Sequence, residues 1–163
     1  MTSLAKPDRT WEPDLRRALE LVLQLMPIPG RSGEEGEVSQ FVRRELLRAG
    51  AAASAIQTDS AHRRTPDGGQ TGNLIFTLPG TVRAPRRMLS AHLDTVPICV
   101  GSQPVRQGDV VRSANPDTGL GADDRAGVAV ILNTALEILR RGLPHPPLTF
   151  CWFVQEETGL NGS

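Results

Sequence analysis

The run Leu148-Thr149-Phe150-Cys151-Trp152-Phe153-Val154 is nearly all apolar and leads, after Gln155, into the acidic pair Glu156-Glu157. A strand that is covered on both faces in the core of an α/β protein has this composition. We therefore expect residues 148–154 to form a central strand, with two carboxylates at its carboxyl end. Ligands of open α/β sheets bind at that end of the strands.

A second apolar segment is followed by another pair of polar side chains. Residues 88–91 predict a short strand, and His92 and Asp94 come next in the stretch Ser90-Ala-His-Leu-Asp-Thr-Val-Pro97. Side chains two residues apart at a strand end can point the same way. A neutral imidazole is a common zinc ligand, and a nearby carboxylate often fixes its orientation. The alternative is an incidental His-Asp pair in a surface loop.

A third group of polar residues lies between a glycine-rich loop and a predicted helix, in Gly119-Leu-Gly-Ala-Asp-Asp-Arg-Ala-Gly127. An aspartate at a helix start accepts backbone N–H bonds, which explains Asp124 as an N-cap. Asp123 is the candidate for a bridging metal ligand, because its two carboxylate oxygens can each face one ion. The glycines lack the full fingerprint of a nucleotide-binding loop. Three segments are thus expected to build one site.

The rest of the chain alternates helices with strands, which predicts an α/β fold with a largely parallel or mixed sheet. Helices are expected at residues 12–26, from a capping box of Ser32 and Glu35 to residue 49, and at 124–141. Strands are expected at 55–58, 73–78, 88–91 and 148–154, and residues 107–112 predict a hairpin arm. The apolar face expected of the first helix consists of Leu15, Leu19, Val22 and Met26.

Composition bounds the class of protein. The 163 residues are enough for about one domain, and 18 basic residues balance 18 acidic ones. This balance predicts neither a nucleic-acid partner nor an anionic membrane partner. No apolar run reaches the roughly 18 residues of a membrane span, and residues 1–9 lack a secretion signal. Two cysteines without a CxxC spacing are expected to be buried free thiols, as in a reducing cytoplasm.

The three motifs together resemble the N-terminal motifs of the co-catalytic zinc metallopeptidase and amidohydrolase family. They are His92-Leu-Asp94-Thr-Val-Pro97, Gly121-Ala-Asp123-Asp124-Arg-Ala-Gly127 and Glu156-Glu157-Thr-Gly159-Leu160. The family includes peptidase T (tripeptide aminopeptidase), acetylornithine deacetylase, aminoacylase and glutamate carboxypeptidase. The form Gly-Ala-Asp-Asp-x-Ala-Gly is most similar to the peptidase T branch. The resemblance runs from about Trp11 to the last residue.

The resemblance implies a role for each site residue. His92 would ligate one metal ion, with Asp94 supporting it as a catalytic residue, and Glu157 would ligate the other ion. Asp123 would bridge both ions. Glu156 would be the general base and acid for a metal-activated water that attacks a peptide or amide carbonyl. The implied cofactor is Zn2+, two ions in the complete site, and the mixed nitrogen and oxygen ligands also suit Co2+ or Mn2+.

The resemblance also implies a fold and a domain organisation. The fold would be a three-layer α/β structure, with a mixed or mostly parallel sheet flanked by helices. Family members continue with a further acidic ligand, a lid or dimerisation domain and a late histidine ligand. Residues 1–163 are therefore expected to be the N-terminal part of a catalytic domain, truncated before the later strands and the lid. We expect this part alone to be inactive, because metal binding and folding are coupled.

The implied substrate is a short peptide, and the implied activity is that of an aminopeptidase. An amidohydrolase or deacylase acting on N-acyl amino acids is the first alternative, since substrate choice depends partly on the lid. A truncated, non-catalytic interaction module is the second, and metal content would distinguish it. A homodimer is one option for the full-length form, and the sequence leaves the oligomeric state open.

Overall fold

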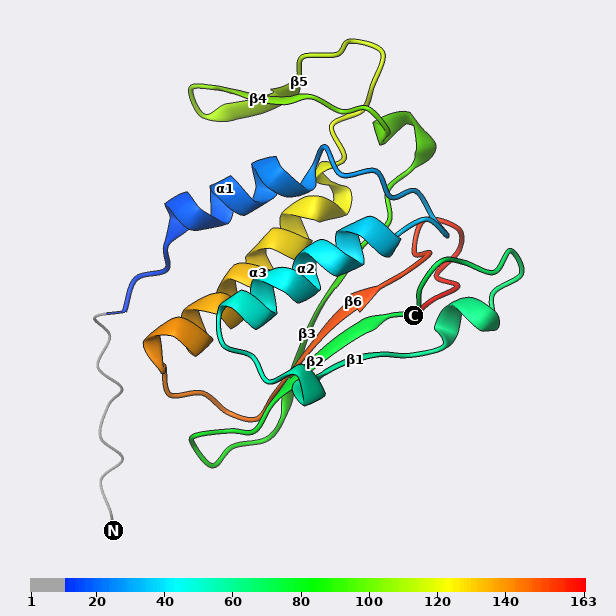
Figure 1. Ribbon diagram of the computed structural model, residues 1–163. Helices are drawn as coiled ribbons and strands as arrows, with labels where there is room; N and C mark the ends of the chain where they lie inside the picture. Colours follow the sequence, from blue (N-terminus) through cyan, green and yellow to red (C-terminus); the bar gives the residue numbers. More distant parts are fainter. Residues whose placement is uncertain (1–10) are drawn as a thin grey trace.

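The computed structural model describes residues 11–163 (Figure 1), so the expectation of an unexported start at residues 1–9 lies outside the described residues. The helices are α1 (Leu15–Leu25), α2 (Gly36–Arg48) and α3 (Ala122–Arg141), with short 3-10 turns η1 (Ala53–Ala55), η2 (Ala61–Arg63) and η3 (Pro97–Cys99). The strands are β1 (Ile56–Thr58), β2 (Leu74–Leu78), β3 (Arg87–His92), β4 (Pro104–Gln107), β5 (Val110–Ser113) and β6 (Leu148–Phe153).

Four of the strands form one mixed sheet in the order β1-β2-β6-β3. The β1/β2 and β2/β6 pairs are antiparallel, whereas β3 and β6 run parallel. The expected central position of β6 is confirmed, since it is hydrogen-bonded on both sides. Strands β4 and β5 form a separate antiparallel hairpin, as the sequence predicts. The mixed sheet also confirms the predicted α/β class.

The three helices lie on the same side of the sheet (Figure 1). Helix α3 packs on β3 and β6, and both α1 and α2 pack on α3. The aromatic rings of Phe76, Phe150 and Trp152 are fully buried and stack in a row, with centroids 5.8 Å and 6.2 Å apart. On its inner face, α3 carries Val128 and Leu132, which are fully buried. This core fixes α3 against the strands that carry the polar motifs.

The buried face of α1 overlaps the expected one only in part. Met26 is buried and Val22 packs against the core, as expected, but Leu15 is 72% exposed, and Leu21 and Leu25 are fully buried instead. Apolar residues occupy nearly every position from 18 to 23, so the helical period alone fits more than one face. Packing against α3 selects the face that is buried.

The expected capping box of Ser32 and Glu35 is wrong. Helix α2 begins at Gly36, with Glu35 at the N-cap position and no side-chain cap. The Ser32 hydroxyl instead donates to Asp94 Oδ2 at 2.6 Å. The fully buried Glu35 carboxylate accepts the N–H groups of Gly33 at 2.7 Å and Gln155 at 3.0 Å. Both side chains therefore form hydrogen bonds with residues outside α2 and do not cap this helix.

Cys99 and Cys151 are both free, as expected, but only Cys151 is buried, and Cys99 is partly exposed. Burial raises the pKa of Cys151 to about 11, so this thiol is protonated at neutral pH. No helix among residues 11–163 has both the length and the apolar character that crossing a membrane requires.

The packing of α3 predicts a stability difference between two neighbouring positions. Leu132→Ala should lower the free energy of unfolding by about 2–5 kcal/mol, because Leu132 is fully buried and its removal leaves a cavity. Val130→Ala, on the exposed face of the same helix, should change it by no more than about 0.5 kcal/mol. Urea denaturation measures both, and equal losses would contradict the packing described.

Candidate metal centre

Two neighbouring strands deliver polar residues to one edge of the sheet. His92 is the last residue of β3 and lies opposite Phe153, the last residue of β6. Asp94 follows β3, and the pair Glu156 and Glu157 follows β6. Since β3 and β6 are parallel neighbours, their carboxyl ends lie at the same edge. The structure therefore brings together the residues that the sequence places at separate strand ends.

Asp123 joins this edge from the start of α3. Its backbone and that of Asp124 are not helical, and the peptide bond between them is cis. Asp123 Oδ1 lies 3.1 Å from His92 Nε2, and its side chain is 86% exposed. Asp124 Oδ1 accepts the N–H of Gly127 at 3.0 Å, which confirms its expected role as an N-cap. Its Oδ2 also accepts the backbone N–H of His92 at 3.3 Å, which ties α3 to β3.

Three of the predicted ligands converge. His92, Asp123 and Glu157 each offer one ligand atom, and these atoms all lie within 4.8 Å of one another. Glu156 Oε2 lies 3.8 Å from His92 Nε2, so its carboxylate borders the same cluster. One imidazole and two carboxylates form a donor set that zinc, cobalt and manganese accept. The side chains present therefore fit a divalent cation.

The electrostatics of the cluster also favour a cation. Burial acts to lower the pKa of His92, but the negative charges of Asp94, Asp124 and Asp123 together raise it to about 9. Burial raises the pKa of Glu157, and the carboxylate of Asp123 raises it further. Neighbouring carboxylates thus contribute to both shifts, beside burial. A positive ion would relieve this repulsion, and it would compete with the proton for the imidazole nitrogen.

Asp94 is fully buried and holds the cluster in place. Its carboxylate accepts the Ser32 hydroxyl at 2.6 Å and the backbone N–H groups of Glu156 at 3.0 Å and Glu157 at 3.1 Å. Nδ1 of His92 lies 3.1 Å from the Asp94 carbonyl and 3.5 Å from its Oδ1. Burial acts to raise the pKa of Asp94, but the hydrogen bonds it accepts bring it down to about 2. The carbonyl and the ionised carboxylate of Asp94 thus both face Nδ1, which leaves Nε2 of the imidazole toward Asp123.

Sequence reasoning missed the buried arginine of the motif at residues 121–127. Arg125 is fully buried, and its Nη2 donates to the carbonyl of Ile28 at 3.2 Å. Burial lowers its pKa to about 10, although the nearby charges of Asp94 and Glu35 act in the opposite direction. A signal was present, because Arg125 lies three residues before Val128 and so falls on the apolar face of α3.

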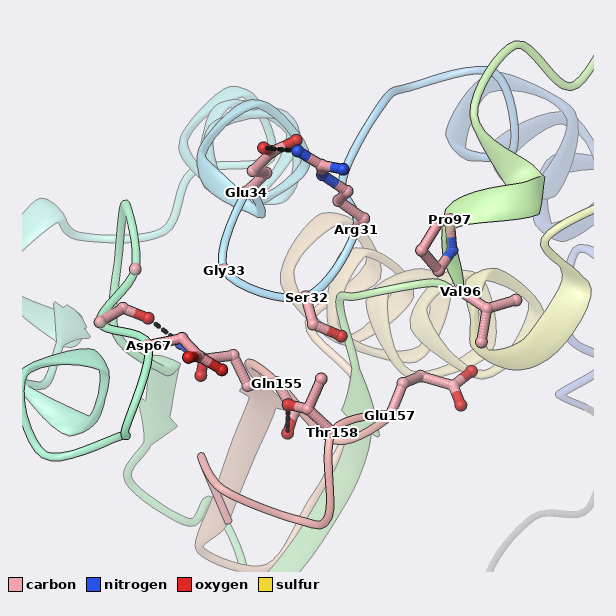
Figure 2. A pocket seen from close by; sticks show the side chains of 12 residues that line it. Arg31, Ser32, Gly33, Glu34, Asp67, Val96, Pro97, Gln155, Glu157 and Thr158 are labelled. Atoms are coloured by element: carbon pink, nitrogen blue, oxygen red, sulfur yellow. Dashed lines mark hydrogen bonds and ion pairs between the residues drawn. The ribbon is translucent and has the colours of Figure 1, made fainter.

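A cavity of about 450 Å³ adjoins the cluster (Figure 2). Glu157 belongs to the cluster and also lines this cavity. Ser32 also lines it, so the hydroxyl that holds Asp94 belongs to the cavity wall. This is a volume typical of small-molecule sites. The cluster therefore has room for a substrate beside it.

Comparison with known proteins agrees with this geometry. The profile of peptidase family M28 matches residues 73–163. The uncharacterized protein YqjE of Bacillus subtilis is 31% identical over 148 residues, which are 91% of this chain and 38% of YqjE. A tripeptidase structure from Staphylococcus aureus has a TM-score of 0.81 and 30% identity, over 92% of this chain and 39% of that one. The aminopeptidase PepT structure from Bacillus cereus has a TM-score of 0.81 and 27% identity, with the same coverage.

These matches confirm the predicted family resemblance, its closeness to peptidase T and the α/β fold class. The chain spans less than two fifths of the length of YqjE and of the two solved structures.

The cluster predicts that metal binding depends on His92. In the complete gene product, His92→Ala should weaken Zn2+ binding by at least about 100-fold, because it removes a ligand rather than an outer group. His145→Ala is the matched control, since His145 precedes β6 and lies at the opposite end of that strand. Calorimetric titration with Zn2+ measures both affinities. Equal Zn2+ affinity in the wild type and His92→Ala would contradict the site.

Proposed function

Because the chain belongs to peptidase family M28, we propose that residues 1–163 form the N-terminal part of the catalytic domain of a metal-dependent aminopeptidase. The observation that carries this proposal is the convergence of His92, Asp123 and Glu157 within 4.8 Å, with Glu156 beside them. Short peptides are the proposed substrates. The similarity to structures named as a tripeptidase and as the aminopeptidase PepT supports that choice.

Two zinc ions are the proposed cofactor, with His92 as a ligand of one, Glu157 of the other and Asp123 shared. The carboxylate of Asp123 suits a shared ligand, because it has two oxygens and its side chain is 86% exposed. A bound ion would polarise the substrate carbonyl and lower the pKa of a water molecule to about 7. Zinc usually takes about four ligands, so we propose that others come from elsewhere in the complete protein. The 163 residues alone would then be inactive.

Glu156 is the proposed general base and acid. Its backbone N–H is held by Asp94 Oδ1 at 3.0 Å, and its Oε2 lies 3.8 Å from His92 Nε2. The side chain is 35% exposed, so water can reach it. Glu156 would take a proton from the water that attacks the carbonyl carbon. It would then give that proton to the amine nitrogen as the C–N bond breaks.

Asp94 is the proposed positioning residue for this chemistry. One carboxylate holds the backbone of both Glu156 and Glu157 and lies against the imidazole of His92. It would therefore hold Glu156, which transfers the proton, in a fixed position relative to the proposed ligands His92 and Glu157. Groups that orient metal ligands in this way affect metal affinity or activity by about 10–100-fold.

Two other functions remain to be distinguished by experiment. A deacylase acting on N-acyl amino acids would use the same ligands and the same base. A non-catalytic interaction module would need neither. The free cysteines support a cytoplasmic location, which we also propose.

The role of Glu156 predicts a separation of metal binding from turnover. In the complete gene product loaded with zinc, Glu156→Gln should keep its metal content and lose about 10²–10⁴-fold in kcat on a tripeptide. Metal analysis and steady-state kinetics measure the two quantities. The matched control is Glu37→Gln, an exposed glutamate in the first turn of α2.

Each outcome identifies which statement fails. Full turnover by Glu156→Gln would remove the proposed base. Cleavage of N-acyl amino acids but not of tripeptides by the wild type would favour the deacylase. Absence of both metal and hydrolysis would favour the interaction module. Turnover by residues 1–163 alone would contradict the proposal that further ligands are needed.

A further inference from the structure

Residues 154–162 form a short loop that carries the proposed base and one proposed ligand, and its two ends meet at the sheet. In Figure 1 this loop leaves the end of β6, and the end of the chain lies next to the start of β2. Gly162 packs so closely against Val154 that an added Cβ would overlap the Val154 carbonyl oxygen. The backbone N–H of Asn161 also donates to the carbonyl of Gln155 at 3.1 Å. The loop is therefore closed at its base.

The side chain of Asn73 joins the two ends of this loop. Asn73 immediately precedes β2 and is 5% exposed. Its Oδ1 accepts the backbone N–H of Val154 at 2.9 Å, and its Nδ2 donates to the carbonyl of Gly162 at 2.6 Å. A backbone N–H can only donate and a carbonyl oxygen can only accept, so these two contacts fix the orientation of the amide. One buried amide thus spans the base of the loop.

The Asn73 amide is itself held from the side of β1. Oδ2 of Asp59 accepts a second hydrogen bond from Nδ2 of Asn73 at 3.0 Å, and its Oδ1 accepts the backbone N–H of Asn73 at 2.8 Å. The backbone N–H of Asp59 donates to the carbonyl of Asn73 at 3.1 Å. Each polar group of Asn73 therefore has a partner, and the side chain is fixed before any ligand binds.

The middle of the loop is held separately from its ends. Asp94 accepts the backbone N–H groups of Glu156 at 3.0 Å and Glu157 at 3.1 Å, whereas Asn73 contacts neither glutamate. If the ends of the loop could separate, the loop would have more conformations, and ordering its middle would cost more conformational entropy. Asn73 can therefore influence the acidic pair from the base of the loop.

We propose that Asn73 is a further positioning residue for the metal centre, because it closes the loop that presents Glu156 and Glu157. The proposal rests on the proposed metal-dependent hydrolysis and assigns a part in it to a residue that touches neither ligand nor base. A displacement of about 1 Å, caused far from the reacting atoms, can cost about 100-fold in rate. Groups that orient metal ligands affect metal affinity by about 10–100-fold.

Hydrogen exchange of the metal-free complete gene product tests the closure of the loop. Asn73→Ala should speed exchange at the backbone amides of Glu156 and Glu157 by about 10-fold or more, because the loop opens more often. Asn133→Ala is the matched control, since Asn133 is 4% exposed in α3 and its side chain donates to Asp14. It should leave exchange at the two amides within about 2-fold of the wild type. An equal increase in both variants, or none in Asn73→Ala, overturns the proposal.

Zinc binding and turnover test the consequence for the site. Asn73→Ala should weaken Zn2+ binding about 10-fold in a calorimetric titration, because Glu157 is less well held but still present. At saturating zinc, kcat on a tripeptide should fall about 10-fold or more, because Glu156 is displaced. The visible absorption of the Co2+-loaded protein should change as well, since it reports the geometry of the ligands.

A loss of global stability alone would not produce these effects. Leu132→Ala lowers the stability of the core without touching the loop, so it should keep the Zn2+ affinity, the kcat and the Co2+ absorption of the wild type at a temperature where the variant is folded. Equal losses in Leu132→Ala and Asn73→Ala, or wild-type values in Asn73→Ala, overturn the positioning role.

A second variant opens the loop without changing Asn73, and it decides the question if Asn73→Ala does not fold. In Gly162→Ala the added Cβ would overlap the carbonyl oxygen of Val154, so the two ends must move apart. The same faster exchange and weaker zinc binding are expected. The matched control is Ser163→Ala, at the next and exposed position. If Gly162→Ala behaves like Ser163→Ala, the proposal is overturned.

Exchange and zinc affinity do not depend on hydrolysis, so they separate this proposal from the proposed function. If the wild type cleaves nothing while Asn73→Ala opens the loop and weakens zinc binding, the aminopeptidase fails and the positioning role stands. If the wild type cleaves tripeptides and Asn73→Ala matches its controls, the aminopeptidase stands and the positioning role fails.

Discussion

The buried carboxylate of Asp94 is the contact on which the site depends. It accepts hydrogen bonds from Ser32, in the loop before α2, and from the backbone of Glu156 and Glu157, after β6. It also lies against His92, at the end of β3. A carboxylate that stays buried without such partners costs several kcal/mol, so burying Asp94 requires all of these segments to be in place. The contacts that hold the ligands in place are therefore also contacts that hold the fold together.

Local patterns in the sequence were sufficient for much of this arrangement. The nearly continuous apolar composition of β6 predicts a central strand, and its position next to Glu156 and Glu157 predicts a site at its carboxyl end. The convergence of His92 and Asp123 could also be expected, because both follow from the rule that ligands gather at one edge of the sheet. Strand order made this reasoning effective: a parallel β3/β6 pair places the two strand ends side by side.

Contacts between distant segments could not be predicted in the same way. Ser32 and Glu35 have the spacing of a capping box, which is a local signal, but their side chains bond to residues far away in the sequence, Asp94 and Gln155. Arg125 is similar: it is buried on the inner face of α3, and the charges of two carboxylates distant in the sequence, Asp94 and Glu35, act against the burial that lowers its pKa. Gly30 lies against the same side chain: a Cβ there would lie 2.7 Å from Arg125 Nη2, so the guanidinium would have to shift.

Gln155 shows why the metal ligands and the cavity behave as one unit. Its backbone has a φ of +55°, a left-handed conformation that costs a residue with a side chain about 1–2 kcal/mol. Two contacts offset this cost: its N–H donates to Glu35 at 3.0 Å and its side chain to Gly68 at 2.7 Å. The turn at this residue directs the following pair, Glu156 and Glu157, back onto Asp94. Gln155 therefore both turns the chain toward Glu156 and Glu157 and holds the loop at Gly68 that lines the cavity. A displacement of that loop would reach the metal ligands through this one residue.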